Sequence, residues 1–373
     1  MGHGPAGVEP SGARDRRPVE AVVTTEPDGV EVVQRQRDAC GLTHQPLLVL
    51  DAVRDLLDAH GIGEGPIAWQ RIGAGQSNVT YLLRRGPRPP LPRSAHDMVR
   101  EARIQQLVCR EGLPVPEILA VCEDESVLGV PFYVMSALDG EVVTDSLPTA
   151  LDSRSDRAAI GAVVVDILLR LHSVDVTHGE LSAFGRPDGY LDRQVTRFAG
   201  LWSVNSRREL PLVDELAQWL SRHRPMSQRP ALVHGDYRIG NLMFERIPPA
   251  RVLAVLDWEM ATLGDPLADL GYLTATWSEP GTMPTPLHLS PVTGLPGFAT
   301  TADLTELYAA ASALDLTPLP WYQTLALWKA AIFCEAMHTR WLDGERPGDE
   351  FAPALADGVP LLLEQALRHA NEL

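Results

Sequence analysis

The sequence predicts an α+β protein in which a small β-rich lobe precedes a larger helical lobe. Two observations carry this prediction. The first 140 residues contain short apolar runs separated by Gly and Pro, a pattern typical of strands and turns. After Gly140, apolar residues recur at the three- and four-residue spacing of amphipathic helices. At 373 residues, the chain is also long enough for two domains or lobes.

The expected elements follow the chain in order. Residues 1–45 lack a periodic apolar pattern and are predicted to form a disordered tail. The small lobe, residues 46–140, is expected to contain two helices and four strands: helices over 46–60 and 95–111, strands over 67–72, 79–83, 115–122 and 131–135. The helical lobe, residues 141–373, is expected to contain seven helices and two short strands: helices over 157–172, 190–202, 213–220, 267–277, 305–314, 320–341 and 353–370, strands over 232–234 and 252–256.

Composition predicts a cytoplasmic protein that binds neither membranes nor nucleic acid. No apolar run approaches the roughly 18 to 20 residues that cross a bilayer, and the N-terminus lacks the apolar core of a signal peptide. The four cysteines lie far apart and form no C-x-x-C pair, which favours a reducing compartment. The net charge of −17 would repel a phosphate backbone.

A polar cluster between His234 and Asp269 carries the chemistry. Residues 234–241 read H-G-D-Y-R-I-G-N, and Asp257 follows Asn241 by sixteen residues, directly behind the apolar run 252–256. Phosphoryl transfer needs a carboxylate that orients the attacking hydroxyl and accepts its proton, and oxygen ligands that hold Mg²⁺. The cluster can supply both, although the same residue types also occur in turns and helix caps. His234 is expected to be a packed, hydrogen-bonded side chain that shapes the turn.

These motifs resemble the aminoglycoside phosphotransferase family, a branch of the protein-kinase-like fold. The similarity is closest to the subgroup whose kinase-like domain is fused to some acyl-CoA dehydrogenases. It covers about residues 46–345, and its most specific part is 234–270. Further matching stretches are Gly75–Asn78, Pro92–Met98 and Cys122–Met135.

The resemblance implies ATP and Mg²⁺ as cofactors and assigns roles to individual residues. Asp236 is implied as the catalytic base, Asn241 and Asp257 as Mg²⁺ ligands, and Asp269 as a residue that braces the catalytic loop. The nucleotide is implied under the glycine loop and along a backbone segment that reads the adenine, a set comprising Gly73, Gly75, Gln76, Ser77, Asn78, Ser136 and Leu138. The loop alone could equally be an ordinary hairpin turn, but Gly75 would let backbone N–H groups approach phosphate oxygens.

The sequence departs from the family pattern in the small lobe. Kinases of this fold hold the α- and β-phosphates with a lysine paired to a helix glutamate, but the only lysine of this chain is Lys329. Arg84 or Arg85 is therefore expected to take its place, with Glu101 as the partner. Only eight residues separate Gly75 from Arg84, which leaves room for one strand and predicts a truncated nucleotide lobe.

Together these features predict an ATP-dependent phosphotransferase that acts on a hydroxyl group of a small molecule. The alternative is a pseudokinase or nucleotide-sensing module that acts through a partner. The acceptor is less defined. Nine acids and one base between residues 253 and 339 would attract a cationic aminosugar. Seven arginines between residues 84 and 110 could instead hold the phosphates of a CoA thioester as well as those of ATP. The subgroup resemblance favours a hydroxyacyl or other small metabolite over an aminoglycoside.

Overall fold

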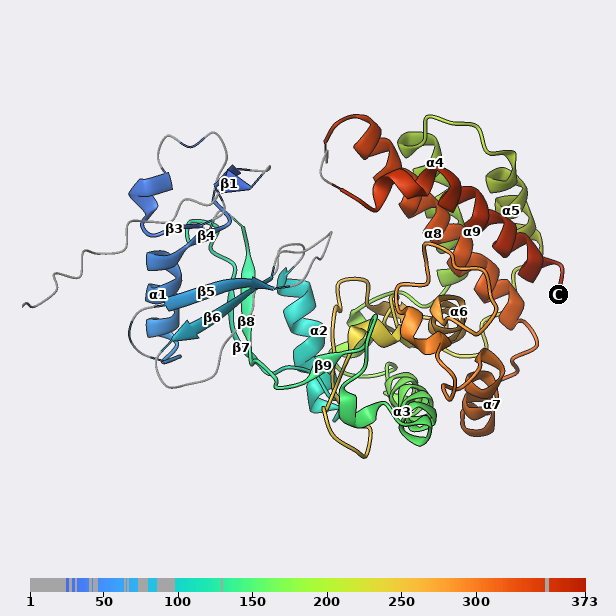
Figure 1. Cartoon of the computed structure of the whole chain (residues 1–373), viewed down its shortest axis with the longest axis horizontal. Helices are drawn as coiled ribbons and strands as arrows, with labels where there is room; N and C mark the ends of the chain where they lie inside the picture. The colour runs from blue at the N-terminus through green and yellow to red at the C-terminus, as the bar shows by residue number, and fades with distance from the viewer. Residues whose placement is uncertain are drawn as a thin grey trace, which may run out of the picture. The chain divides into compact units, whose positions relative to one another are not determined.

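The computed structural model describes residues 25–26, 29–30, 32–39, 42, 46–63, 65, 67–72, 80–85, 98–128, 130–345 and 349–373 (Figure 1). The chain divides into two compact units. The smaller unit comprises Met1–Ile67, Arg85–Pro87 and Asp124–Val130, and the larger unit comprises Ala68–Arg84, Arg88–Glu123 and Pro131–Leu373.

The smaller unit contains short strands and one helix. Strand β1 (Thr25–Glu26) pairs antiparallel with β2 (Gly29–Val30), and β3 (Val32–Val33) pairs parallel with β4 (Leu48–Val49). A 3₁₀ turn spans Gln36–Ala39, and α1 (Leu50–Ala59) follows β4. The side chains of β3 and β4 are buried. The sequence predicts a disordered tail over residues 1–45 and did not indicate these short elements, because two-residue strands are too short to show a periodic pattern.

The larger unit begins with paired strands and a helix. Most of the two-stranded sheet of β5 (Ile67–Ile72) and β6 (Thr80–Arg85) belongs to it, and Trp69 packs edge-on against Tyr81. Helix α2 (Met98–Arg110) packs against β7 (Ile118–Cys122) and β8 (Phe132–Met135), which pair antiparallel. The sequence assigns α2, β7 and β8 to the first lobe, whereas their contacts group them with the C-terminal residues.

Seven long helices form most of the larger unit. Helix α8 packs against α4, α6 and α9 (Figure 1), because it is apolar on nearly every side and buries Trp321 and Trp328 completely. The capping box of Thr300 and Asp303 fixes the start of α7. The helices are α3 (Arg154–Ser173), α4 (Tyr190–Asn205), α5 (Pro211–Arg222), α6 (Leu267–Thr276), α7 (Thr301–Ser312), α8 (Leu319–Leu342) and α9 (Leu355–Ala370).

Five short strands position the candidate site. Strand β10 (Ala231–Val233) pairs antiparallel with β13 (Thr262–Gly264), and β11 (Leu242–Phe244) lies between β9 (Glu141–Val142) and β12 (Val252–Val255). The sequence predicts β10 and β12 but not β9, β11 or β13, each of which has only two or three residues. These pairings bring the segment after β10 next to the segment after β12.

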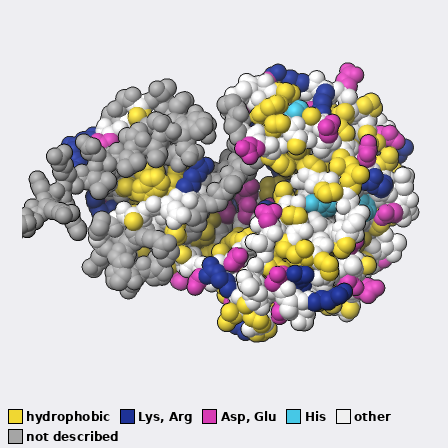
Figure 2. Space-filling view, viewed as in Figure 1, with side chains coloured by type: hydrophobic (Ala, Val, Ile, Leu, Met, Phe, Trp, Pro, Cys, Tyr) yellow, Lys and Arg dark blue, Asp and Glu magenta, His cyan; other side chains and the backbone are white. Residues whose placement is uncertain are grey.

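Two features of the structure concern the predictions about membranes and nucleic acid. No helix within the described ranges combines the length and the apolar character needed to cross a membrane. Acidic and basic side chains are interspersed over the larger unit on the face that Figure 2 shows, and no continuous basic patch lies there.

Candidate functional site

The candidate site is built on the loop between β10 and β11. At its second residue, Gly235 has φ +85°, and a Cβ there would lie 2.8 Å from the carbonyl oxygen of Met260. Glycine is therefore required both by backbone conformation and by the close approach of the segment after β12. The loop closes with a 3₁₀ turn over Ile239–Asn241 that leads into β11.

His234 fixes the start of this loop. Its ring is fully buried against Trp258, at a centroid distance of 4.9 Å. The Asp236 amide donates to Nδ1 at 3.3 Å, so Nε2 carries the proton and donates to the Leu256 carbonyl at 3.0 Å. The expectation of a packed histidine that shapes the turn is confirmed.

Asp269 braces the same loop from α6. Its fully buried carboxylate accepts hydrogen bonds from the backbone amides of His234 at 2.7 Å and Gly235 at 2.8 Å. His172 on α3 lies 3.3 Å from the same carboxylate through Nε2 and 2.7 Å from the Tyr308 hydroxyl through Nδ1. The bracing implied by the resemblance is present, and His172 and Tyr308 extend it to α3 and α7.

Asp236 and Asn241 contact each other across the loop. The Asn241 amide nitrogen donates to Asp236 Oδ2 at 2.7 Å and to the Asp236 carbonyl at 2.9 Å. Because a carboxylate only accepts, this contact fixes which end of the amide faces Asp236. Within the described part of the chain, no hydrogen bond reaches Asn241 Oδ1, so this oxygen remains able to bind a cation.

Asp257 is held beside this pair by its neighbour in sequence. The Leu256 amide donates to the Asn241 carbonyl at 2.8 Å. Asp257 itself has φ +63°, a left-handed conformation that costs a non-glycine residue about 1 kcal/mol or more and is concentrated at functional sites. Surrounding protein atoms and then repulsion from Asp236 raise the pKa of Asp257. The Asp257 side chain still reaches solvent. A cation bound beside it would offset the repulsion from Asp236 and so lower the pKa of Asp257 again.

These oxygens suit a hard divalent cation. Mg²⁺ prefers carboxylate and amide oxygens and completes its shell with water and phosphate, and Asn241 and Asp257 offer one oxygen of each kind. Across the described ranges, no group of three His, Cys, Asp or Glu side chains could hold a metal ion. A cation bound here would therefore take its remaining ligands from phosphate and water. Asp265 cannot contribute readily, since its buried oxygens accept from Leu267 N and the Tyr322 hydroxyl.

Glu101 lies on α2 with an incompletely paired carboxylate. It is 3% exposed, and Oε1 accepts from the Tyr133 hydroxyl at 3.1 Å, which in turn accepts from the Gln105 amide. Within the described residues, Oε2 has no hydrogen-bond partner. Burial and then repulsion from Asp257 raise the pKa of Glu101 to about 7, against the opposing effects of the Tyr133 hydroxyl and the Trp258 backbone. Such an oxygen is a suitable partner for a cationic side chain.

We expect Glu101→Gln to stabilise the nucleotide-free protein at pH 8 and to have little effect at pH 5. The pKa of Glu101 is about 7 in the folded protein against a reference value of 4.5. Its contribution to stability is therefore full below pH 4.5 and is lost as pH rises through 7. The shift corresponds to a gain of about 3 kcal/mol in the free energy of unfolding at pH 8. Urea denaturation of the parent and of Glu101→Gln in Mg²⁺-free buffer at pH 5 and pH 8 measures this difference in the free energy of unfolding.

The matched control is Glu111→Gln, which removes an exposed carboxylate just beyond the end of the same helix. It should change the free energy of unfolding by less than about 0.5 kcal/mol at either pH. An equal effect of Glu101→Gln at pH 5 and pH 8 would contradict the raised pKa.

Of the other predicted nucleotide-binding residues, the structure describes some and not others. Arg84 and Arg85 end β6, and their side chains lie outside the described residues, as does the whole loop of Gly73, Gly75, Gln76, Ser77 and Asn78. The Ser136 amide donates to the Glu117 carbonyl, and Ser136 Oγ accepts from the Glu117 amide. The Ser136 amide is thus already engaged, whereas within the described residues no hydrogen bond reaches the Ser136 carbonyl or the Leu138 amide.

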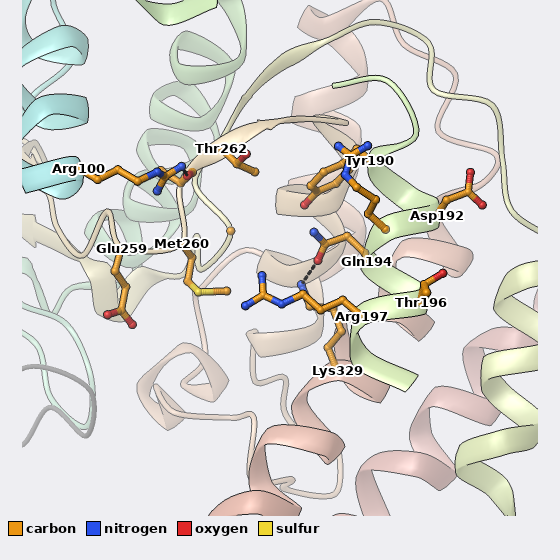
Figure 3. A pocket seen from close by; sticks show the side chains of 13 residues that line it. Arg100, Tyr190, Asp192, Gln194, Thr196, Arg197, Glu259, Met260, Thr262 and Lys329 are labelled. Carbon is orange, nitrogen blue, oxygen red and sulfur yellow. Dashed lines mark hydrogen bonds between the residues drawn. The ribbon is translucent and has the colours of Figure 1, made fainter. Parts of the chain in front are cut away.

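A cavity of 670 Å³ opens beside Gly235, within the larger unit (Figure 3). Residues of α2, α4, α8 and the 259–262 segment line it, among them Gln194, Arg197 and Lys329. Sequence reasoning did not identify Gln194 or Arg197. The usable signal was their spacing with Tyr190, since residues 190, 194 and 197 share one face of a helix.

Comparison with known proteins identifies the family. The model of the phosphotransferase enzyme family (APH) matches residues 68–288, more than half of the chain. Acyl-CoA dehydrogenase family member 10 of Mus musculus is 40% identical over 242 residues, which are 62% of this chain and 22% of that protein. Acyl-CoA dehydrogenase family member 11 of Gallus gallus is 33% identical over 328 residues, 83% of this chain and 41% of that protein. The chain thus spans less than half the length of either relative.

A solved structure supports the same assignment. A protein of Ralstonia eutropha JMP134, assigned as an aminoglycoside phosphotransferase, is 30% identical and superposes with a TM-score of 0.73, covering 86% of this chain and 98% of the other. These comparisons confirm the kinase-like α+β fold class and the resemblance inferred from the motifs. The family match includes the braced loop, Asn241 and Asp257, and the chain belongs to the phosphotransferase enzyme family.

Proposed function

We propose that the chain is a Mg²⁺-dependent kinase that transfers the γ-phosphoryl group of ATP to a hydroxyl group of a small molecule. The observation that supports this most strongly is the gathering of Asp236, Asn241 and Asp257 around the Leu256 backbone. It combines one carboxylate for the acceptor with two oxygen ligands for a cation, which is the minimum that phosphoryl transfer requires.

In the proposed reaction, Asp236 orients the acceptor hydroxyl and takes its proton. The hydroxyl oxygen forms a bond to the γ-phosphorus while the bond from that phosphorus to the bridging oxygen of ATP breaks, giving a phosphate monoester and ADP. The Asn241 amide holds Asp236 in place through the 2.7 Å hydrogen bond. Asn241 Oδ1 and Asp257 would hold Mg²⁺, which when bound neutralises charge on the phosphates.

The nucleotide would be held in part by an arginine in place of the usual lysine. Glu101 supplies the acidic partner that such a cation needs, since one of its oxygens has no partner within the described residues. An arginine can bind phosphate with a bidentate fork. The loop of Gly73, Gly75, Gln76, Ser77 and Asn78 is proposed to cover the phosphates, and the Leu138 amide and Ser136 carbonyl to contact the base.

We expect one of the variants Arg84→Ala and Arg85→Ala to weaken ATP binding by about 10- to 100-fold, the range of a lost charged hydrogen bond. Successive residues of a strand point to opposite faces, so the other variant should bind ATP nearly as the parent does. Calorimetry with ATP and Mg²⁺ compares the two directly. Normal affinity in both variants would exclude an arginine at either position and favour the nucleotide-sensing alternative.

The proposed acceptor is a hydroxyacyl compound or another small hydroxylated metabolite rather than an aminoglycoside. The relatives with 40% and 33% identity carry the acyl-CoA dehydrogenase name, which supports an acyl acceptor. Incubation with ATP and Mg²⁺ and a panel of hydroxy acids, hydroxyacyl-CoAs and aminoglycosides tests both points, with mass spectrometry to detect acceptors that gain one phosphoryl group. Phosphorylation of aminoglycosides alone would overturn the acceptor assignment. No transfer to any acceptor, together with no binding of ATP, would favour the pseudokinase.

A further inference from the structure

The cavity beside Gly235 has a charge opposite to that of the protein as a whole. Four cationic side chains line it, Arg100, Arg193, Arg197 and Lys329, against the two acids Asp192 and Glu259. Asp192 also forms an ion pair with Arg224, which does not line the cavity. In a chain with 49 acidic and 32 basic residues, such a lining indicates a site that attracts negative charge.

Lys329 reaches this cavity from α8 without an acidic partner. Its ammonium nitrogen donates to Gln194 Oε1 at 3.0 Å and lies 4.6 Å from the centre of the Phe198 ring (Figure 3). In the part of the chain that the structure describes, no carboxylate forms an ion pair with it. Burial lowers the pKa of Lys329 to about 8, although the charges of Asp269 and Asp236 favour its charged form. A half-buried cation with two remaining donors and no counterion is suited to an anionic ligand.

Arg197 provides a second cation on the same wall. It follows Gln194 by three residues on α4, so both side chains face the cavity (Figure 3). Within the described ranges, its guanidinium makes no hydrogen bond and no ion pair. The charge of Arg197 also disfavours the charged form of Lys329. Two neighbouring cations that repel each other in one cavity are stabilised together when an anion binds to both.

The acids that could favour a cationic acceptor are occupied elsewhere. Of the nine acids between residues 253 and 339, Glu259 is the one that lines the cavity. Asp269 braces the loop, Asp303 caps α7, and Glu335 is buried in an ion pair with Arg208. A polycationic aminosugar would therefore meet mostly positive charge beside Asp236.

We propose that this cavity is the acceptor site and that Lys329 and Arg197 select an acceptor that carries an anionic group, a carboxylate or a phosphate. The inference deepens the proposed kinase function and rests on it for the identity of the reacting hydroxyl. Because Gly235 lines the cavity and Asp236 follows it, an acceptor held there by its anionic group presents its hydroxyl close to the proposed base. Lys329 and Arg197 are thus specificity-determining residues and take no part in the proton transfer.

The test compares matched acceptors in the full chain: 3-hydroxybutyrate, its uncharged amide, 3-hydroxybutyryl-CoA and kanamycin. Lys329→Met keeps the length of the side chain and removes its charge. We expect the parent to bind the acid or the thioester at least about tenfold more tightly than the amide, and Lys329→Met to reduce this preference by about tenfold. Preference for the acid identifies a carboxylate ligand, and preference for the thioester alone identifies its phosphates.

Two further variants separate charge selection from a structural effect. Lys329→Arg should restore much of the preference, whereas Arg222→Met, which removes an exposed charge that contacts Gln218 on α5, should leave it as in the parent. Three outcomes would overturn the proposal. The parent could bind acid, thioester and amide equally, Lys329→Met could lose affinity equally for all three, or the parent could bind kanamycin more tightly than the anionic acceptors. Calorimetry measures binding without turnover. An anion preference without phosphoryl transfer from ATP would contradict the kinase function alone. Phosphoryl transfer without an anion preference would contradict this inference alone.

Discussion

Asp236→Asn is expected to lower kcat by about 10²- to 10⁴-fold, the usual contribution of a positioned general base. An amide cannot accept the proton of the acceptor hydroxyl. The Asn side chain nevertheless keeps the size of the carboxylate and an oxygen that can accept from Asn241. Removing this negative charge also relieves the repulsion that raises the pKa of Asp257, so ATP binding should survive or become tighter.

Steady-state turnover and a separate ATP titration distinguish these two effects of Asp236→Asn. The matched control is Asp214→Asn, the same change at an exposed position of α5, which should leave turnover as in the parent. If Asp236→Asn retained more than about a tenth of the parent turnover, Asp236 would not be the base.

Asp257→Asn and Asp257→Ala are expected to weaken the binding of the cation in the presence of ATP by about 10- to 100-fold. Loss of the carboxylate leaves the cation short of one anionic oxygen. The two variants are needed together because the backbone at residue 257 has φ +63°. Asn tolerates this conformation well, whereas Ala adds strain. A shared loss of affinity therefore reports the carboxylate rather than the backbone.

Paramagnetic resonance with Mn²⁺ as the probe measures this loss directly, since Mn²⁺ accepts the same oxygen ligands as Mg²⁺. Unchanged Mn²⁺ affinity in Asp257→Asn, with ATP present, would reject Asp257 as a ligand. A loss in Asp257→Ala alone would assign the effect to the backbone conformation.

The long helices of the larger unit could be predicted from the sequence, because the side of each helix that is buried carries apolar residues at regular spacing. Helices α3, α8 and α9 each extend over four or more turns, so their apolar spacing is clear. Strands β9, β11 and β13 have two or three residues, and their pairing depends on distant partners rather than on local pattern. The spacing of Asp236, Asn241 and Asp257 was visible in sequence, whereas their proximity results from the contacts around Leu256.

Charge counts along the chain do not describe the charge of the cavity beside Gly235. The nine acids of residues 253–339 suggested a cation-binding cleft. In the folded protein, however, Asp269 and Glu335 are buried with partners and Asp303 caps a helix. The seven arginines of residues 84–110 divide in a similar way: Arg100 lines the cavity, and Arg103 and Arg110 pair with Glu180. The local charge of a site depends on which side chains remain without partners after folding, and sequence order does not contain that information.

The most direct test of the central claim is a calorimetric titration of ATP into the full chain, with Mg²⁺ and again with excess chelator. If Asn241 and Asp257 hold a cation against the nucleotide phosphates beside Asp236, ATP binds measurably with Mg²⁺ and at least about tenfold more weakly without it. The same affinity in both buffers, or no binding in either, would contradict the account.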